Sequence, residues 1–225
     1  MESSRKRLDR DVLVATALAL ADAEGLSAVT TRRVGQEHGV SAMALYRHFR
    51  DKDQILDALA ERLLADVRLP ETDDRPWGDQ LRDVLVAFLE SLRPHAAAAE
   101  LVITRVLVSS PGLALAERTL GLLDAGGFQV EQAAEIAGQA LCSVVTLVVN
   151  EPGRSHMDDP ELRDDAIRAK QASLEALSPK HYPHIVAAAG ALASCASRDV
   201  YYERGIDLII AGVRGVQAGT KAPVV

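Results

Sequence analysis

The spacing of apolar residues follows a helical period along nearly the whole chain. Between Asp9 and Gly219, apolar side chains recur every three or four residues among strong helix formers such as alanine, leucine, glutamate and arginine. No segment alternates apolar and polar residues in the way that a half-buried strand does. The pattern therefore predicts an all-α fold.

Glycine and proline residues divide this pattern into about ten predicted helices. The first four predicted helices are short and closely spaced, and the fourth covers Lys52–Arg68. A polar segment with two prolines, residues 70–76, follows this fourth helix and has the composition of a connection between modules. We therefore predict an N-terminal domain over residues 1–66 and a larger helical domain over residues 67–225.

A helix, a tight turn and a second helix are predicted within residues 30–49. Thr30 or Thr31 is suited to cap the first helix, and Gly39 supplies the left-handed residue that ends it. Ser41, only two residues later, is suited to cap the second helix. A turn this short is typical of a helix-turn-helix rather than of a general bundle loop.

The second helix of this unit has an apolar face and an outward face. Leu45 and Phe49 lie one turn apart and are expected to pack on the first long helix of the chain. At about 100° per residue, the other side presents a mixed apolar, aromatic and basic surface. In a DNA-binding protein, this surface enters the major groove.

The side chains around this surface match the chemistry of DNA. Arg47 has the fork geometry to read a guanine, and Ala44 and Met43 suit thymine methyl groups. Lys52 follows Asp51, a predicted cap, and so stands at a helix N-terminus that favours a phosphate. Each residue alone is also typical of a solvated helix, so the prediction depends on the whole set. The predicted DNA-binding residues are Thr30, Thr31, Arg32, Ala42, Met43, Ala44, Tyr46, Arg47, His48 and Lys52.

Charge is distributed unevenly between the two predicted domains. The chain has a formal net charge of −7, yet residues 1–52 carry nine Lys and Arg against seven Asp and Glu, which leaves −9 for the remainder. A weakly basic module on an acidic body fits a protein that presents one end to DNA. The basic tail Arg5–Arg7 fits either a minor-groove or phosphate contact or a solubilising, disordered tail.

Composition predicts a soluble cytoplasmic protein. Apolar residues make up 48% of the chain, enough for a core, and the longest apolar runs fall short of the roughly 20 residues that span a membrane. The N-terminal segment lacks the apolar stretch and cleavage site of an export signal. Cys142 and Cys195 both lie within apolar helical patterns, so we expect two reduced core thiols.

Three segments of the N-terminal part resemble the signature of the tetracycline-repressor family. They read GLSAVTTRRV over residues 25–34, GVS over residues 39–41 and LYRHFRDKDQIL over residues 45–56. The resemblance implies a three-helix DNA-binding head, a fourth helix that links it to a body, and a dimer that reads a palindromic operator. It also implies a repressor of bacterial type that leaves double-stranded DNA when a small molecule binds.

Residues 77–82, 122–133 and 205–213 are similar to the C-terminal domain of the tetracycline-repressor subgroup. In that family the last helix and the helix over residues 131–150 join two subunits in a four-helix bundle. An apolar stripe with small neighbours fits such a homodimer interface, and the alternative is that the stripe packs within its own subunit. The stripe consists of Ile206, Ile209, Ile210 and Val213, and its small neighbours are Gly205, Ala211, Gly212 and Gly215.

The ligand site is predicted from the resemblance alone. Val102 and Asn150 stand where the tetracycline-binding relatives have a histidine and a glutamate that help to hold drug-bound magnesium, although Glu151 is one place away. This departure puts magnesium–tetracycline in doubt as the effector. Abundant alanine and valine suit a bulky, largely apolar molecule, or simply close helix packing. The residues implied to line the pocket are Arg68, Phe88, Val102, Arg105, Thr119 and Asn150.

We expect neither an enzyme nor a metal or cofactor site. The six histidines show no ligand spacing with cysteine, aspartate or glutamate, and His181 and His184 lie in a predicted proline-rich loop. Two alternatives to a repressor stay open. One is an activator with the same fold, and the other is a helical ligand-binding protein that does not bind DNA.

Overall fold

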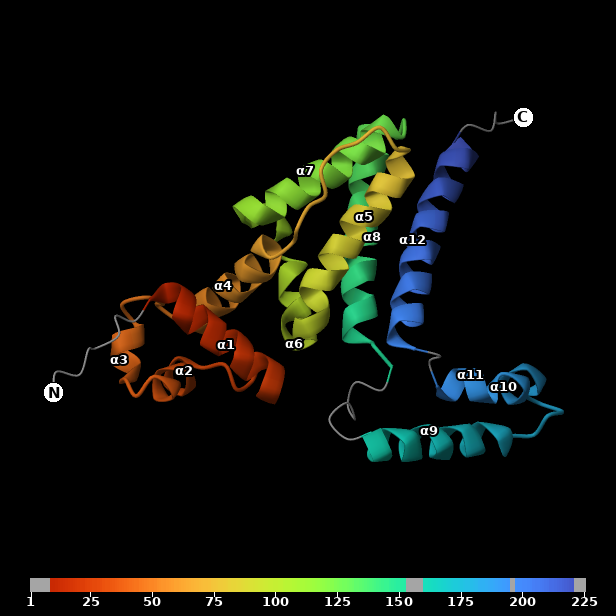
Figure 1. Ribbon diagram of the computed structural model, residues 1–225, viewed down its shortest axis with the longest axis horizontal. Helices are drawn as coiled ribbons and strands as arrows, with labels where there is room; N and C mark the ends of the chain where they lie inside the picture. The colour runs from red at the N-terminus through yellow and green to blue at the C-terminus, as the bar shows by residue number, and fades with distance from the viewer. Residues whose placement is uncertain (1–8, 153–159, 195–196, 221–225) are drawn as a thin grey trace. The chain divides into compact units, whose positions relative to one another are not determined.

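The computed structural model describes residues 9–152, 160–194 and 197–220, which fall into two compact units. The first unit contains the chain up to residue 149 and again from residue 209, and the second contains residues 150–208. The described residues form twelve α-helices and three 3₁₀-helices and contain no strand (Figure 1). The predicted all-α fold is therefore confirmed.

Four helices make up the N-terminal head of the first unit. Two of the predicted caps are present: the Thr30 side chain accepts a hydrogen bond from the Arg33 amide at 3.1 Å, and Asp51 accepts one from the Gln54 amide at 2.9 Å. Gly39 has a φ of +63°, as a left-handed residue at the turn requires. The four helices are α1 (Arg10–Glu24), α2 (Thr31–Glu37), α3 (Ala42–Leu45) and α4 (Lys52–Ala65).

Two of these helices are shorter than the sequence suggested. Helix α3 ends at Leu45, whose carbonyl accepts from the amides of both His48 and Phe49, so the chain continues as a turn. Helix α4 ends at Ala65 rather than Arg68. The Val67 amide bonds to the Leu64 carbonyl in a tighter turn before the chain reaches Pro70.

The head has a closed apolar core. Leu45 and Phe49 are 0% and 1% exposed, which confirms the predicted inner face of the helix-turn-helix. Leu13 and Ala17 of α1 are also fully buried. The Arg10 guanidinium lies 5.3 Å from the centre of the Phe49 ring, a cation–π arrangement that closes one side of this core.

The rest of the first unit is built on α5, α7 and α8, which pack on one another. Between α5 and α7 the chain is irregular, because Pro94 interrupts the helical hydrogen bonding and short turns follow. The elements are α5 (Trp77–Leu92), η1 (Arg93–His95), α6 (Ala96–Ala99), η2 (Glu100–Val102), η3 (Val106–Val108), α7 (Ser110–Ala125) and α8 (Val130–Val149). Helix α4 packs on α5, α6, η2 and α7, and thereby joins head and body.

Helix α8 is apolar enough, by length and composition, to cross a membrane. A core helix of a soluble protein has the same composition, and α8 buries a row of small and medium apolar side chains. Ala133, Ala137, Val144 and Val148 are all less than 9% exposed. Its packing against α5 and α7 accounts for these buried side chains, while 39% of the apolar window as a whole is buried.

The apolar stripe of the last helix, α12 (Arg198–Thr220), lies within the chain rather than on a free face. Ile206, Ile210 and Val213 are 1%, 6% and 7% exposed. The expectation that the stripe faces another subunit is therefore wrong for these three side chains, which pack within their own subunit, and the fourth, Ile209, is half-buried. Leu208, at 74% exposure, lies on the uncovered side of α12.

The second unit consists of α9 (Pro160–Glu175), α10 (Pro183–Ala187), α11 (Ala189–Ala193) and the beginning of α12. Helix α9 packs on α10 and α11. The Glu151 carboxylate is buried and lies 2.7 Å from the Arg198 guanidinium, so this charge has a partner inside the unit.

Candidate functional site

The outward surface of the helix-turn-helix is exposed as its pattern predicted. Met43 is 74% exposed and Tyr46 is 51% exposed, and Arg47 is also exposed. Ala44 and His48 are half-buried between this surface and the core, while the side chain of Ala42 lies outside the described set. This arrangement leaves one guanidinium, one phenol and one thioether on a short convex element, where they can contact base edges and phosphates.

Residues from neighbouring helices flank this surface. Thr30 caps α2 through its side chain, and exposed Arg32 follows Thr31 on the first turn. Lys52 is half-buried, and its ammonium donates to the Leu26 carbonyl at 3.0 Å. Lys52 thus ties the start of α4 to the loop before α2, a structural contact that the sequence did not indicate.

Arg33 is a basic residue of the same segment whose charge is paired within the head. Its guanidinium donates to Glu24 at 2.9 Å and pairs with Glu37 at 2.6 Å. The hydrogen bond and the negative charge of Glu24, together with Glu37, raise the pKa of Arg33 above its ordinary value. Its charge is therefore compensated inside the head and is less available to a phosphate.

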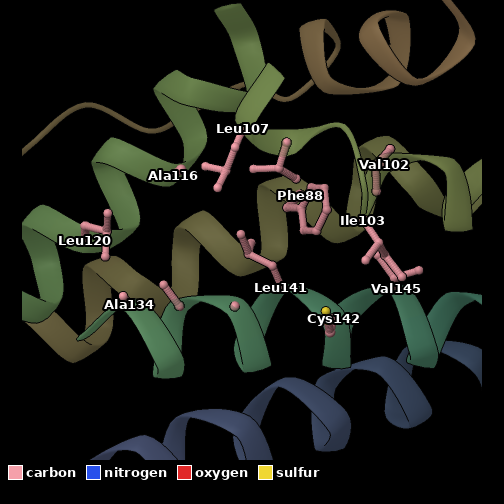
Figure 2. Close-up of a pocket in the computed structure, with 13 residues that line it drawn as sticks. Phe88, Val102, Ile103, Leu107, Ala116, Leu120, Ala134, Leu141, Cys142 and Val145 are labelled. Atoms are coloured by element: carbon pink, nitrogen blue, oxygen red, sulfur yellow. The ribbon is translucent and has the colours of Figure 1, made fainter. Parts of the chain in front are cut away.

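An apolar cavity of about 220 Å³ lies between the body helices (Figure 2). An apolar cavity of about 150 Å³ suffices for benzene, so this one has room for a larger ring system. Among the described residues, no charged side chain lines it, and Cys142 supplies the lone side-chain heteroatom. The lining residues are Phe88, Val102, Ile103, Val106, Leu107, Ala116, Leu120, Ala134, Ala137, Gly138, Leu141, Cys142 and Val145.

Residues 100–108, here called the cavity wall, separate the cavity from α4. The wall consists of η2, a turn and η3, and η2 packs directly on α4. Helix α7 approaches the other end of the wall so closely that a Cβ atom at Gly112 would lie 2.1 Å from the Val106 carbonyl oxygen. Only glycine permits this contact, which fixes η3 against the start of α7.

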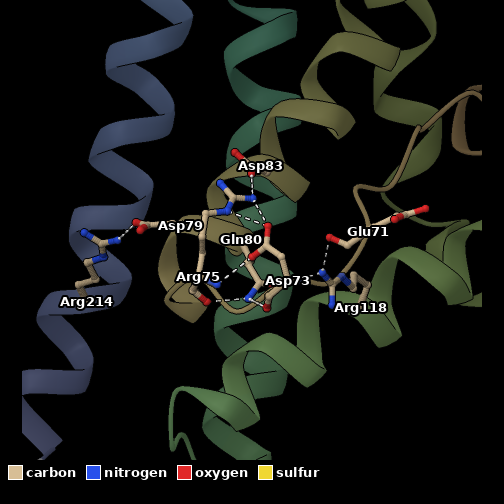
Figure 3. Close-up of polar contacts among 8 residues, drawn as sticks. All are labelled: Glu71, Asp73, Arg75, Asp79, Gln80, Asp83, Arg118 and Arg214. Atoms are coloured by element: carbon tan, nitrogen blue, oxygen red, sulfur yellow. Dashed lines mark hydrogen bonds and ion pairs between the residues drawn. The ribbon is translucent and has the colours of Figure 1, made fainter.

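Polar side chains hold the segment between α4 and α5, residues 66–76, here called the connector (Figure 3). Gln80 donates to the carbonyls of Asp73 and Arg75 at 2.9 and 2.7 Å, and accepts from Arg118 at 3.1 Å. Arg118 also donates to Thr72 at 3.0 Å. Since Arg118 lies on α7 between cavity residues Ala116 and Leu120, the same helix lines the cavity and holds the connector.

Ion pairs strengthen the connector at its C-terminal end. Arg75 contacts both Asp73 and Asp83 at 2.7 Å. Hydrogen bonds from the side chain and the amide of Arg75 lower the pKa of Asp73, and the two carboxylates raise the pKa of Arg75. Nearby, Arg214 of α12 donates to Asp79 of α5 at 2.5 Å, which fastens α12 to the same end of the body.

Family models match nearly the whole described chain. The model described as "Bacterial regulatory proteins, tetR family" matches residues 13–59, and the model "Tetracyclin repressor-like, C-terminal domain" matches residues 69–216. The chain belongs to the tetracycline-repressor family. It is thus a transcriptional regulator of a family of ligand-responsive repressors, with a DNA-binding helix-turn-helix and a ligand-binding body.

Individual relatives match the sequence of this regulator over most of their length. The tetracycline repressor protein class C of Escherichia coli is 29% identical, over 95% of this chain and 94% of the relative. The Streptomyces coelicolor TetR family protein ActR, solved in complex with actinorhodin, is 28% identical with a TM-score of 0.78, over 93% of this chain and 98% of ActR. BioQ, solved with its double-stranded DNA operator, is 26% identical with a TM-score of 0.58, over 72% of this chain and 99% of BioQ.

Membership of the tetracycline-repressor family carries several general properties. Its members bind DNA operators, bind small-molecule ligands and form dimers, and they act as regulators rather than as enzymes. They are soluble DNA-binding proteins. In the described part of this regulator, no group of three or more His, Cys, Asp or Glu residues is placed to hold a metal ion.

Two of the six residues implied to bind ligand line the cavity, namely Phe88 and Val102. Thr119 is fully buried and donates to the Leu115 carbonyl at 2.8 Å. Arg105 belongs to the wall but does not line the cavity, and its guanidinium pairs with Asp57 of α4. Two more lie elsewhere: Arg68 lines a separate polar hollow with His95 and Glu90, and Asn150 belongs to the second unit.

The other lining residues were not singled out in the sequence, and the reason is chemical. Leu141, Val145 and Ala116 have the same composition and helical spacing as core residues elsewhere in the chain. A faint signal was present in Gly138 and Ala134, because small residues one turn apart on an otherwise bulky apolar helix leave space beside it. The same signal also arises from close packing of two helices, so it does not identify a cavity.

Proposed function

We propose that this regulator is a homodimeric repressor that binds a palindromic operator through α3 and leaves it when a neutral, largely apolar molecule enters the cavity. One observation carries the proposal: the wall of the cavity packs on α4, the helix that carries the head. A change in the cavity therefore acts directly on the element that positions the recognition surface.

The DNA-facing part of the proposal assigns roles by chemistry. Arg47 reads a guanine, and Met43 and Ala44 contact thymine methyl groups. Tyr46 and His48, together with Thr31 and Arg32 at the start of α2, contact phosphates at the groove edges. The exposure of Met43, Tyr46 and Arg47 supports these roles, because each is free of the head's own core.

The effector part follows from the lining of the cavity. A charged ligand would lose its hydration among apolar side chains without gaining a partner, at a cost of several kcal/mol or more. A neutral, bulky molecule such as an apolar antibiotic, a polyketide-like metabolite or a lipid gains by burial instead. Val102 lines the cavity where a metal-ligating histidine would be needed, which argues against magnesium–tetracycline as the effector. The ActR complex with actinorhodin shows a relative that binds a named small molecule.

The dimer part rests on the uncovered faces of α8 and α12. Leu208 and Val216 of α12 are 74% and 44% exposed, and Gly212 lies exposed between them at helical spacing. A glycine on such a face lets a second helix approach closely. Two copies joined here bring two heads to two half-sites, as a palindrome requires. We assign residues 1–66 to the DNA-binding domain and residues 67–225 to the ligand-binding and dimerisation domain.

Selection of bound duplexes from random-sequence DNA, repeated over a series of salt concentrations and read by sequencing, tests the proposal. A two-fold symmetric motif with half-sites about one helical turn apart, or a multiple of it, is the expected result. Enrichment of an asymmetric single site would contradict the dimer. Steeply salt-dependent binding without any motif would contradict sequence-specific repression.

A further inference from the structure

The cavity wall has one face on the cavity and the other face on the head. Val102, Ile103 and Leu107 of the wall line the cavity, while η2 packs on α4. The wall contains two charged side chains, Glu100 and Arg105, and Arg105, which stands between η2 and η3, is the one shown in an ion pair with α4. Arg105 is therefore the one point at which this part of the wall offers α4 a strong, directional contact.

Arg105 is anchored on both sides. Its Nε donates to the Asp57 carboxylate of α4 at 2.6 Å, a charge-assisted hydrogen bond. Its Nη1 donates back to the wall itself, to the Leu101 carbonyl at 3.3 Å and to the Thr104 hydroxyl at 3.0 Å. With 22% of its side chain exposed, Arg105 is held in place and follows any movement of the wall backbone.

The turn that bears Arg105 lies between two ends of the wall that are held by packing. At one end η2 packs on α4, and at the other the backbone contact between Gly112 and Val106 holds η3 on α7. Residues 103–105 between them form a turn outside both 3₁₀-helices. Ile103, in this turn, lines the cavity, so a molecule in the cavity contacts the segment that bears Arg105.

We propose that the Arg105–Asp57 pair transmits the filling of the cavity to the DNA-binding head, with Arg105 acting as a positioning residue and not as a ligand contact. The proposal rests on the proposed function, because it names the link between the cavity and the operator-binding surface. When the turn at residues 103–105 moves, Arg105 pulls Asp57 with it, and α4 moves the head.

The test uses the full-length protein and a side chain in place of an unidentified ligand. Ala116→Phe fills the cavity from α7, and Ala116→Leu serves if the larger side chain prevents folding. The operator affinity of each filled variant is compared with that of its unfilled parent in three backgrounds: the wild type, Asp57→Asn and Glu61→Gln. Glu61 lies one turn from Asp57 on α4 and is also exposed, so the control removes the same charge from the same helix.

Filling is expected to lower operator affinity in the wild type and in Glu61→Gln by the same factor. In Asp57→Asn the factor is expected to shrink by about twofold to fivefold, the range for a partly exposed ion pair. Asp57→Glu, which keeps the charge, is expected to restore the full factor. A factor in Asp57→Asn equal to that in the wild type would overturn the proposal, as would a filled cavity that leaves operator affinity unchanged in every background.

The first of these outcomes leaves the proposed function intact, whereas the second also contradicts its effector part. If the unfilled wild type selects no DNA motif, the repressor assignment itself fails before the pair is tested. If the wild type binds its motif and the Asp57→Asn series matches the Glu61→Gln series, the repressor assignment stands and Arg105 has a purely structural role.

Discussion

The recognition surface and the cavity of this regulator are built from opposite kinds of side chain. The surface presents Arg47, Tyr46 and Met43 to solvent, where they add nothing to the core. The cavity is lined by residues such as Phe88 and Val102, both 0% exposed, which belong to the core and also form the cavity surface. Substitutions on the recognition surface can therefore change its specificity without a cost in stability, whereas substitutions in the cavity cannot.

Because of this difference, binding at the two sites should also depend differently on salt concentration. Phosphate binding releases counterions, so contacts on the recognition surface are sensitive to salt. Burial of a neutral molecule in the cavity involves no charge and depends little on salt. Variants of the two sites should therefore differ in stability, in salt dependence and in sequence preference.

The largest expected effect is on stability and comes from the cavity. Phe88→Ala removes a fully buried ring and is expected to lower the free energy of unfolding by about 3–5 kcal/mol. Met43→Ala, at a residue 74% exposed, should change it by less than about 0.5 kcal/mol. Urea unfolding followed by circular dichroism measures both. Equal effects for the two variants would contradict the difference in stability expected between the cavity and the recognition surface.

Next in size is the effect of Arg47 on base preference. Arg47→Ala is expected to cost about 1–3 kcal/mol of operator binding, because a bidentate contact to guanine is lost. The loss should be confined to operators that keep the base which Arg47 reads, and stability should not change. Fluorescence anisotropy on the selected operator and on single-base variants measures the preference. An equal loss on random DNA would remove Arg47 from the base-reading residues.

A smaller effect distinguishes the two roles available to Lys52. If Lys52 leaves the Leu26 carbonyl to bind a phosphate, Lys52→Ala should weaken binding to all sequences and reduce the salt slope by about 1. If Lys52 only ties α4 to the preceding loop, the variant should lower stability and leave the slope unchanged. Affinity measured over a range of salt concentrations, beside an unfolding curve, separates the two results.

The smallest expected effect concerns the connector and pH. Hydrogen bonds from Arg75 place the pKa of Asp73 below its ordinary value of 3.8, so this carboxylate stabilises the folded connector above that pH. The contribution is lost as the pH falls through the lowered pKa. A carbon-detected NMR titration should find a midpoint below 3.8 in the wild type and a higher one in Arg75→Ala. Identical midpoints would show that Arg75 does not hold Asp73 in solution.

The sequence predicted those parts of the molecule in which local chemistry decides the structure. Thr30, Gly39 and Asp51 act at helix ends and turns through their own atoms or backbone, and each was assigned correctly. The inner face of the helix-turn-helix was also predictable, because Leu45 and Phe49 follow the helical period. Residue-by-residue roles on DNA stay predictions.

Tertiary packing decided the parts that the sequence did not reveal. The stripe with Ile210 and Val213 has the same period whether it faces another subunit or its own, and burial alone shows that it faces its own. The cavity has no sequence signature either, because an empty space is defined by how far helices stand apart. Arg105 was assigned to the ligand from a resemblance, while the structure places its guanidinium on Asp57.

The proposed function implies that the content of the cavity sets the separation of the two heads in the dimer. Pulsed electron spin resonance tests it directly, with a spin label at Gln36→Cys on the exposed side of α2 and with both native cysteines replaced by alanine. The account predicts one label-to-label distance in the unfilled dimer, compatible with α3 helices about 34–36 Å apart, and a shift of about 2 Å or more when Ala116→Phe fills the cavity. An unchanged distance in a folded, filled dimer would contradict it.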